Sequence, residues 1–207
     1  MNKGYQPGVG SINNISIFIE GRNGNCNAKY LMTDTLKKLF DLTDKHDIKI
    51  TKFRSDNAAY QQDVIELMED KHLLFYMRMI TSEELKMQIK DITEWKQIEY
   101  NYHSIELTEM WYAPFREEKK YRIIVQRKKN KAAQLDAFSE SAYEYYSIIT
   151  ADTVGTPEEI YTFYNQRGGT SEDVIDILKN DFNWNHLLCS FLDQNTVFMI
   201  LSAIFMF

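Results

Sequence analysis

Apolar and polar residues follow two different periods between residues 12 and 79. Apolar residues at alternate positions in Ile12–Ile19 predict a strand with one buried face. Apolar residues three or four positions apart in Ala28–His46 predict an amphipathic helix. Lys49–Arg54 and Leu73–Met79 have strand patterns on either side of a second helical segment, Gln61–Lys71. This β-α-β-α-β order predicts one sheet with helices packed on it.

From residue 81 to residue 150 the pattern changes. Glu83–Ile89 has the spacing of a short helix, and four further segments alternate polar with apolar or aromatic residues, as antiparallel strands do. These segments are Gln97–Tyr102, Ser104–Met110, Tyr121–Arg127 and Tyr143–Ile149. Lys128–Phe138 has the composition of a flexible loop.

Helical patterns return after residue 155. Thr156 is predicted to cap a helix, with Pro157 at its first position and Glu159 completing a capping box. Glu172–Lys179 resumes a helical spacing after a glycine pair. Thr196–Phe207 is strongly apolar but has only 12 residues. A membrane-spanning helix needs about 20, so we expect a buried helix here and no membrane partner.

Composition narrows the class of protein. The chain has 207 residues, 44% of them hydrophobic and 14% aromatic, which is enough for one large or two small folded domains. Cys26 and Cys189 have no metal-ligand spacing, so reduced thiols in a cytoplasmic protein are expected. Lys3–Gly10 is rich in turn-forming residues but lacks the Lys-Ser/Thr pair of a phosphate-binding loop, which disfavours nucleotide hydrolysis.

Charge is unevenly distributed along the chain. The net charge is −6, which argues against a uniformly basic nucleic-acid-binding protein. Arg116–Lys131 nevertheless holds eight Lys or Arg against two Glu. This window is either a strand hairpin with solvated polar ends or a surface for DNA phosphates.

Candidate chemistry gathers in two places. Asp56 follows a predicted strand, where α/β sheets place reactive groups. Tyr164 and Arg167 lie three positions apart on one helix face. Glu172 and Lys179 lie seven positions apart, nearly two turns, and point the same way. Each alone is better explained as a turn residue, a core aromatic or a surface charge; together they offer carboxylates for a metal and cations for phosphates.

Together, these residues resemble the signature of insertion-sequence DDE transposases. Tyr164, Arg167, Glu172 and Lys179 match the tyrosine, arginine, glutamate and lysine around the family's last acid. FRSDNAAY, which contains Asp56, matches the block around its second acid. Four more blocks match in the same order along almost the whole chain: KGYQPGV from residue 3, EGRNGN from residue 20, YNQRG from residue 164 and NDFNW from residue 180.

The resemblance implies a fold and an activity. The fold would be α/β, a ribonuclease-H-like mixed sheet flanked by helices, formed by residues 1–80 and 151–207. Residues 81–150 would be an antiparallel β-rich insertion between the second and third acids, either contacting DNA and handling hairpins or forming a solvated small sheet. The activity would be DNA cleavage and strand transfer in the cytoplasm of a bacterium.

The resemblance also assigns roles to residues. Asp56 and Glu172 would be catalytic acids that bind Mg²⁺ or Mn²⁺ at a two-metal site. Arg167 and Lys179 would contact DNA phosphates, and Tyr164 would pack or hydrogen-bond beside the DNA backbone. The partner would be DNA with the terminal repeats of the element, with a homodimer on that DNA as one arrangement.

Two departures from the family pattern affect these expectations. The family's first aspartate lies on a strand upstream of the KGYQP block, so we expect a truncated, catalytically incomplete chain that is cut at both ends. Arg167 and Glu172 are separated by four residues, one more than in the family, which on a continuous helix would turn Glu172 by about 100°. The alternatives are a non-catalytic DNA-binding or regulatory remnant, or the product of a decayed reading frame.

Overall fold

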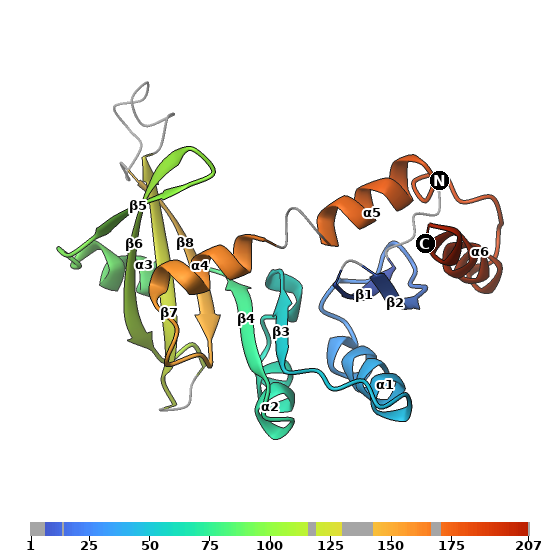
Figure 1. Ribbon diagram of the computed structural model, residues 1–207, viewed down its shortest axis with the longest axis horizontal. Helices are drawn as coiled ribbons and strands as arrows, with labels where there is room; N and C mark the ends of the chain where they lie inside the picture. Colours follow the sequence, from blue (N-terminus) through green and yellow to red (C-terminus); the bar gives the residue numbers. More distant parts are fainter. Residues whose placement is uncertain (1–6, 14, 116–118, 130–142, 167–170, 207) are drawn as a thin grey trace. The chain divides into compact units, whose positions relative to one another are not determined.

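The computed structural model of this chain describes residues 7–13, 15–115, 119–129, 143–166 and 171–206 (Figure 1). It is a mixed α/β protein. Its strands and helices in chain order are β1 Gly8–Ile12, β2 Ile15–Glu20, α1 Met32–Lys45, β3 Lys52–Ser55, the short 3₁₀ helix η1 Asn57–Ala59, α2 Gln62–Asp70, β4 Leu74–Met79, α3 Glu83–Lys90, β5 Lys96–Tyr100, β6 His103–Tyr112, β7 Tyr121–Lys129, β8 Tyr143–Thr150, α4 Pro157–Asn165, α5 Ser171–Asn180 and α6 Leu192–Phe205.

These elements form two compact units. Ile50–Tyr164 form the first, which we call the sheet unit. Met1–Lys49 and Asn165–Phe207 form the second, which we call the hairpin unit. Each unit is described by itself below.

A six-stranded sheet in the order β3-β4-β8-β7-β6-β5 is the centre of the sheet unit. β3 and β4 are parallel, with Ser55 opposite Met77, and every other pair in this sheet is antiparallel. The four strands predicted between residues 97 and 149 are confirmed, each within two residues at either end. They continue the sheet that β3 and β4 begin.

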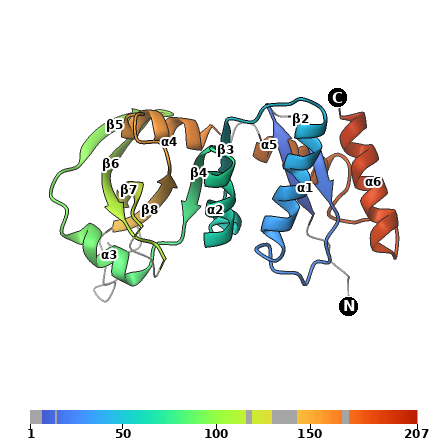
Figure 2. The same cartoon turned by 90° about the horizontal axis from the view of Figure 1, so that it is seen from below.

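Helices pack on both faces of this sheet because side chains alternate along each strand. Tyr76, Ile124 and Ile148 face α4 and are buried with its Ile160 and Tyr161. The residues of opposite parity are also fully buried, among them Met77, Ile123 and Ile149. Figure 2 shows α4 on one side of the sheet and α3 on the other. The sheet is therefore a central layer with helices on both faces.

The predicted start of α4 is confirmed by its hydrogen bonds. The Thr156 backbone N–H donates to Glu159 Oε2 at 2.8 Å, and the Glu159 N–H donates to Thr156 Oγ1 at 3.2 Å. This reciprocal pair is the capping box that the sequence predicted, and it satisfies two backbone donors that a helix start leaves free.

The hairpin unit differs from the sequence prediction in its strands. A single strand over Ile12–Ile19 and a turn over Lys3–Gly10 were expected, but β1 and β2 form an antiparallel hairpin. Asn13 lies in its turn at φ 47°, a left-handed conformation that asparagine tolerates well. The expectation that this strand joins β3 and β4 in one sheet is wrong, because β1 and β2 pair only with each other among the described strands.

Helix α6 is less buried than predicted. Its inward face carries Met199 and Ala203 together with the polar Asn195 and Ser202, all buried. Its outward face exposes apolar side chains, with Phe205 79% exposed. The polar residues face inward because they have partners there: Ser202 Oγ accepts from Trp184 Nε1 at 2.7 Å, and Asn195 exchanges two hydrogen bonds with the Cys189 backbone. No helix in the described ranges is long and apolar enough to cross a membrane.

Candidate active site

Asp56 lies directly after β3, at the carboxyl end of a parallel strand pair. Its side chain is exposed and its backbone is extended, with φ −73° and ψ −168°. Carboxylate Oδ1 accepts the Ala58 N–H at 2.9 Å and so caps η1. Within the described ranges Oδ2 has no hydrogen-bond partner. Asp56 is thus held by one oxygen and presents the other to solvent.

Tyr164 reaches the same strand end from α4. Its hydroxyl donates to the Ser55 carbonyl at 3.1 Å, and its side chain is only 5% exposed. In return, Arg54 Nη1 donates to the Phe163 carbonyl at 2.6 Å. The structure therefore brings Tyr164 to the residue preceding Asp56, although 109 positions separate Tyr164 from Ser55.

The Phe163 ring of α4 contacts side chains of β3 and β4. Tyr76 meets it edge-on, with ring centroids 4.7 Å apart. The Lys52 ammonium lies 4.9 Å and the Arg54 guanidinium 5.0 Å from the centre of the Phe163 ring. These cation–π contacts link Phe163 of α4 to two cationic side chains of β3, the strand that leads to Asp56.

A second carboxylate on this face of the sheet, Asp152, was not predicted from the sequence. Tyr76 donates to its Oδ2 at 2.7 Å, and the backbone N–H groups of Val154 and Gly155 donate to Oδ1. Burial raises the pKa of Asp152, but the hydrogen bonds from Gly155, Tyr76 and Val154 outweigh burial, so the pKa lies below its usual value. Both oxygens are occupied, which makes Asp152 a structural acid of its loop.

The other predicted site residues lie on or before α5. Arg167 lies outside the described residues. Glu172 is the second residue of α5, and its side chain lies outside the described set. Lys179 is exposed in the last turn of α5. Glu172 and Lys179 therefore share one helix of the hairpin unit, whereas Asp56 and Tyr164 belong to the sheet unit.

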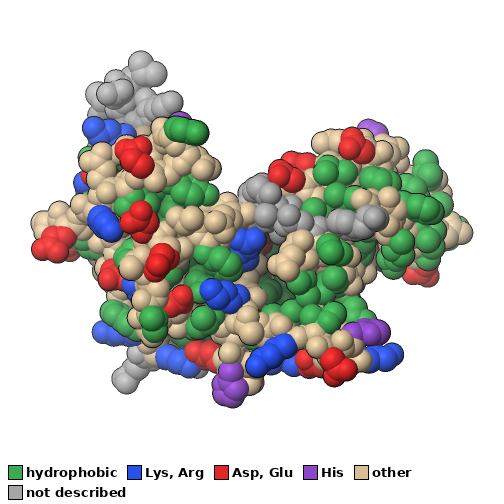
Figure 3. Space-filling model, in the orientation of Figure 1, with side chains coloured by type: hydrophobic (Ala, Val, Ile, Leu, Met, Phe, Trp, Pro, Cys, Tyr) green, Lys and Arg blue, Asp and Glu red, His purple; other side chains and the backbone are tan. Residues whose placement is uncertain are grey.

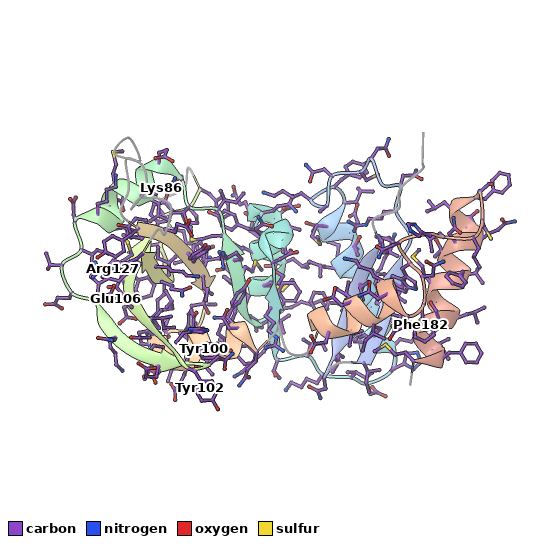
Figure 4. All side chains as sticks on the ribbon, turned by 90° about the horizontal axis from the view of Figure 1, so that it is seen from above. Lys86, Tyr100, Tyr102, Glu106, Arg127 and Phe182 are labelled. Carbon is purple, nitrogen blue, oxygen red and sulfur yellow. The ribbon has the colours of Figure 1, made fainter. Side chains whose placement is uncertain are left out.

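Three of the described cations of the basic window, Lys119, Arg122 and Arg127, have acidic partners within the fold. Lys119 pairs with Glu69 at 2.6 Å. Arg127 donates two hydrogen bonds of 2.8 Å to Glu106, and Figure 4 shows these two side chains together. The exposed cations of this window in the described ranges are Lys119, Lys120, Lys128 and Lys129, of which Lys119 is ion-paired.

Arg122 is the most enclosed cation among the residues of this window that the structure describes. It is 8% exposed and donates to Glu109 and to the carbonyls of Asp152 and Gly155. Lys and Arg are interspersed with Asp and Glu on the face drawn in Figure 3. Strand β7 of this window pairs with β6 and β8, and exposed lysines lie at both of its ends, as in the predicted strand hairpin with solvated polar ends. The alternative, a surface for DNA phosphates, stays a prediction. Residues 130–138 of the predicted loop, as well as Arg116, lie outside the described residues.

The EGRNGN block forms a local network in the hairpin unit. The Glu20 carboxylate accepts from Lys38 at 2.7 Å, from Thr35 at 2.5 Å and from Arg22 at 3.1 Å. Burial raises the pKa of Glu20, but these three donors together bring it below its usual value. The network ties β2 to α1.

The donor chemistry of Asp56 suits a divalent cation. Mg²⁺ prefers carboxylate and water oxygens, and Asp56 presents an exposed carboxylate oxygen. Among the residues that the structure describes, no three His, Cys, Asp or Glu side chains gather into a metal-binding group.

Comparison with known proteins agrees with the sequence blocks. A family model described as "Transposase DDE domain group 1" matches residues 3–206. This match spans both candidate acids and confirms the resemblance drawn from the sequence. No curated protein matched the chain.

Proposed function

This chain belongs to the family of transposase DDE domains, and from that premise we propose that it is the ribonuclease-H-like catalytic domain of an insertion-sequence transposase. Its substrate would be DNA with the terminal repeats of the element, in the bacterial cytoplasm. The observation that supports this best is the exposed carboxylate of Asp56 at the end of β3. It lies next to Ser55, which bonds to Tyr164 of the sequence block around the family's last acid.

In this proposal Asp56 and Glu172 are the acids that bind Mg²⁺ or Mn²⁺. When bound, such ions activate the attacking oxygen and stabilise the leaving oxygen of a phosphodiester. Asp56 has the chemistry for this role because its Oδ1 is used in the η1 cap while Oδ2 stays available. Glu172 is assigned by its match to the family's last acid.

The cations would hold the DNA. Arg167 suits two-pronged binding of a phosphate, and Lys179 acts as a point charge on the exposed side of α5. Tyr164 was predicted to pack or hydrogen-bond beside the DNA backbone, and that contact stays a prediction. A homodimer would let two copies act on the two ends of one element.

The division of the fold follows the same proposal. Residues 1–80 and 151–207 would form the catalytic core, and residues 81–150 would be the β-rich insertion between the acids. The antiparallel order of β5, β6, β7 and β8 supports an insertion of that character. In this structure the four strands extend the β3-β4 pair into one six-stranded sheet.

A nicking assay tests the proposal. The purified chain is incubated with DNA that carries the ends of the element, with and without Mg²⁺ or Mn²⁺. Any nicking should depend on the added metal and should fall by about a hundredfold or more in Asp56→Asn. Asp91→Asn, which changes an exposed acid at the end of α3 in the same unit, is the control and should nick like the parent chain.

Two results would change the assignment. Nicking that survives in Asp56→Asn would remove Asp56 from the site. Salt-dependent binding to the element ends without any metal-dependent nicking would favour the alternative, a regulatory remnant that occupies the ends without cutting them.

A further inference from the structure

We propose that Arg54 and Tyr164 are positioning residues that fix the carboxylate of Asp56, through a pair of hydrogen bonds that we call the β3–α4 clasp. The clasp consists of the bonds from Arg54 to the Phe163 carbonyl and from Tyr164 to the Ser55 carbonyl. This inference rests on the proposed role of Asp56 as a metal-binding acid.

The two bonds of the clasp are reciprocal. The strand donates through Arg54 to the Phe163 carbonyl in the last turn of α4. The helix donates through Tyr164 to the last carbonyl of β3. Each bond crosses 109 positions of sequence, so together they set the distance and the rotation between the end of the strand and the end of the helix.

The surroundings of the clasp favour its hydrogen bonds over bonds to water. Tyr164 is 5% exposed and belongs to the same buried cluster as Tyr76 and Tyr161. The Phe163 ring covers the Arg54 guanidinium, with 5.0 Å between the Arg54 Cζ and the ring centre. A Ser55 carbonyl that lost the Tyr164 hydroxyl would lose a hydrogen-bond donor at a partly buried position, which is unfavourable.

Asp56 is held on its other side as well. Its Oδ1 accepts from Ala58, and Ala59, which ends η1, is 1% exposed. The carboxylate therefore stands between two fixed points, the clasp at Ser55 and the capped turn at Ala58. A metal ligand must keep its place within a fraction of an ångström, so loosening Ser55 should misplace Asp56 without removing any ligand atom.

The clasp also gives Tyr164 a role that needs no contact with DNA. Tyr164 belongs to the sequence block that leads to Glu172, yet its hydroxyl donates to Ser55, the residue before Asp56. The two motif blocks would thus be joined by the protein itself before any substrate binds.

Tyr164→Phe tests the clasp, because it removes one hydroxyl and keeps the ring. We expect amide hydrogen exchange in residues 55–60, measured by mass spectrometry, to become about three- to tenfold faster, as fits the loss of one hydrogen bond. We also expect Mn²⁺ affinity, measured by electron paramagnetic resonance on the full chain, to weaken by about tenfold. Arg54→Gln, which removes the other bond, should give the same two changes.

Tyr161→Phe is the matched control. Tyr161 lies one turn earlier in α4 and packs against Tyr100 of β5, with ring centroids 5.4 Å apart. It should leave exchange in residues 55–60 and Mn²⁺ affinity unchanged. A purely structural role of Tyr164 would instead raise exchange throughout the sheet unit and lower its unfolding midpoint.

The outcomes separate this inference from the proposed function. Unchanged exchange in residues 55–60 in both Tyr164→Phe and Arg54→Gln would overturn the clasp. Equal Mn²⁺ binding by the parent chain and Asp56→Asn would overturn the metal role of Asp56, and with it the functional meaning of the clasp. Faster local exchange together with weaker Mn²⁺ binding supports both.

Discussion

Single residues in this protein take their roles from their tertiary partners. Arg122 belongs to a run of cations that, in sequence, resembles a surface for phosphates. In the fold its guanidinium is enclosed and donates to Glu109 and to the carbonyls of Asp152 and Gly155. A buried arginine with this many acceptors holds a loop in place and is poorly exposed to a ligand.

Arg122→Met should destabilise the protein by about 2 kcal/mol, because it keeps the apolar stem but removes the donor from the partly buried carbonyls of Asp152 and Gly155. Urea unfolding measures this change. Lys120→Met, which changes an exposed cation two positions earlier, is the control and should stay within about 0.5 kcal/mol. Equal stability of the two variants would show that Arg122 does not hold the loop.

Asp152 makes stability depend on pH. Burial raises its pKa, but its hydrogen bonds, led by that from the Gly155 N–H, bring it below the usual value of 3.8. The folded protein therefore binds this proton less readily than the unfolded chain does. The stabilisation is fully present above the unfolded pKa and is lost as pH falls through the lower folded pKa.

Asp152→Asn should therefore reduce the difference in unfolding free energy between about pH 6 and about pH 3, because its amide does not titrate. Urea unfolding at the two pH values measures the difference. An acid dependence as steep as that of the parent chain would mean that other carboxylates cause it.

Among the elements of the hairpin unit, α6 packs closely against the backbone that follows β2. Gly21 follows β2, and a Cβ atom there would overlap the Thr196 hydroxyl oxygen of α6. Thr196 in turn donates to the Leu192 carbonyl at 2.8 Å, which restricts its rotation. Packing within the hairpin unit thus explains Gly21 of the EGRNGN block.

Gly21→Ala should destabilise the protein by about 1–3 kcal/mol, the usual cost of overpacking. Gly8→Ala is a control on the same hairpin, because a Cβ at Gly8 would meet only the Arg22 side chain at 3.6 Å, an ordinary contact. Thermal unfolding followed by circular dichroism compares the two. If Gly21→Ala is as stable as the parent chain and amide hydrogen exchange in α6 is unchanged, the helix can move away from residue 21 at little cost.

For the whole molecule, the net charge of −6 means that DNA binding must depend on local cations. In the window over β7, Glu69, Glu106 and Glu109 pair with Lys119, Arg127 and Arg122, respectively. Lys120, Lys128 and Lys129 of this window are exposed. Lys179 on α5 and Arg167 are the residues that we propose to contact DNA phosphates.

Lys179→Ala should weaken binding to DNA of any sequence and reduce the slope of log affinity against log salt by about one, as expected for one lost phosphate contact. Fluorescence anisotropy at several salt concentrations measures the slope. Lys86→Ala is the control, because Lys86 pairs with Glu83 on the surface of α3. Identical slopes for both variants would exclude Lys179 from the DNA surface.

Much of the fold was determined by the sequence alone, because periodicity, turns and caps are encoded within a few neighbouring residues. The strands between residues 97 and 149, helix α2 and the capping box of Thr156 and Glu159 were all predicted correctly. The family was also recognised from local blocks, which keep their order along the chain.

Only the tertiary structure decided which of these elements meet. Among the described strands, β1 and β2 pair only with each other, Arg122 is enclosed, and Tyr164 bonds to Ser55 across 109 positions. None of these contacts leaves a trace in local spacing, because strand pairing and side-chain burial depend on residues far away in the chain. The partner of each polar group, and hence whether it stabilises the fold or stays available to a ligand, follows from those distant contacts.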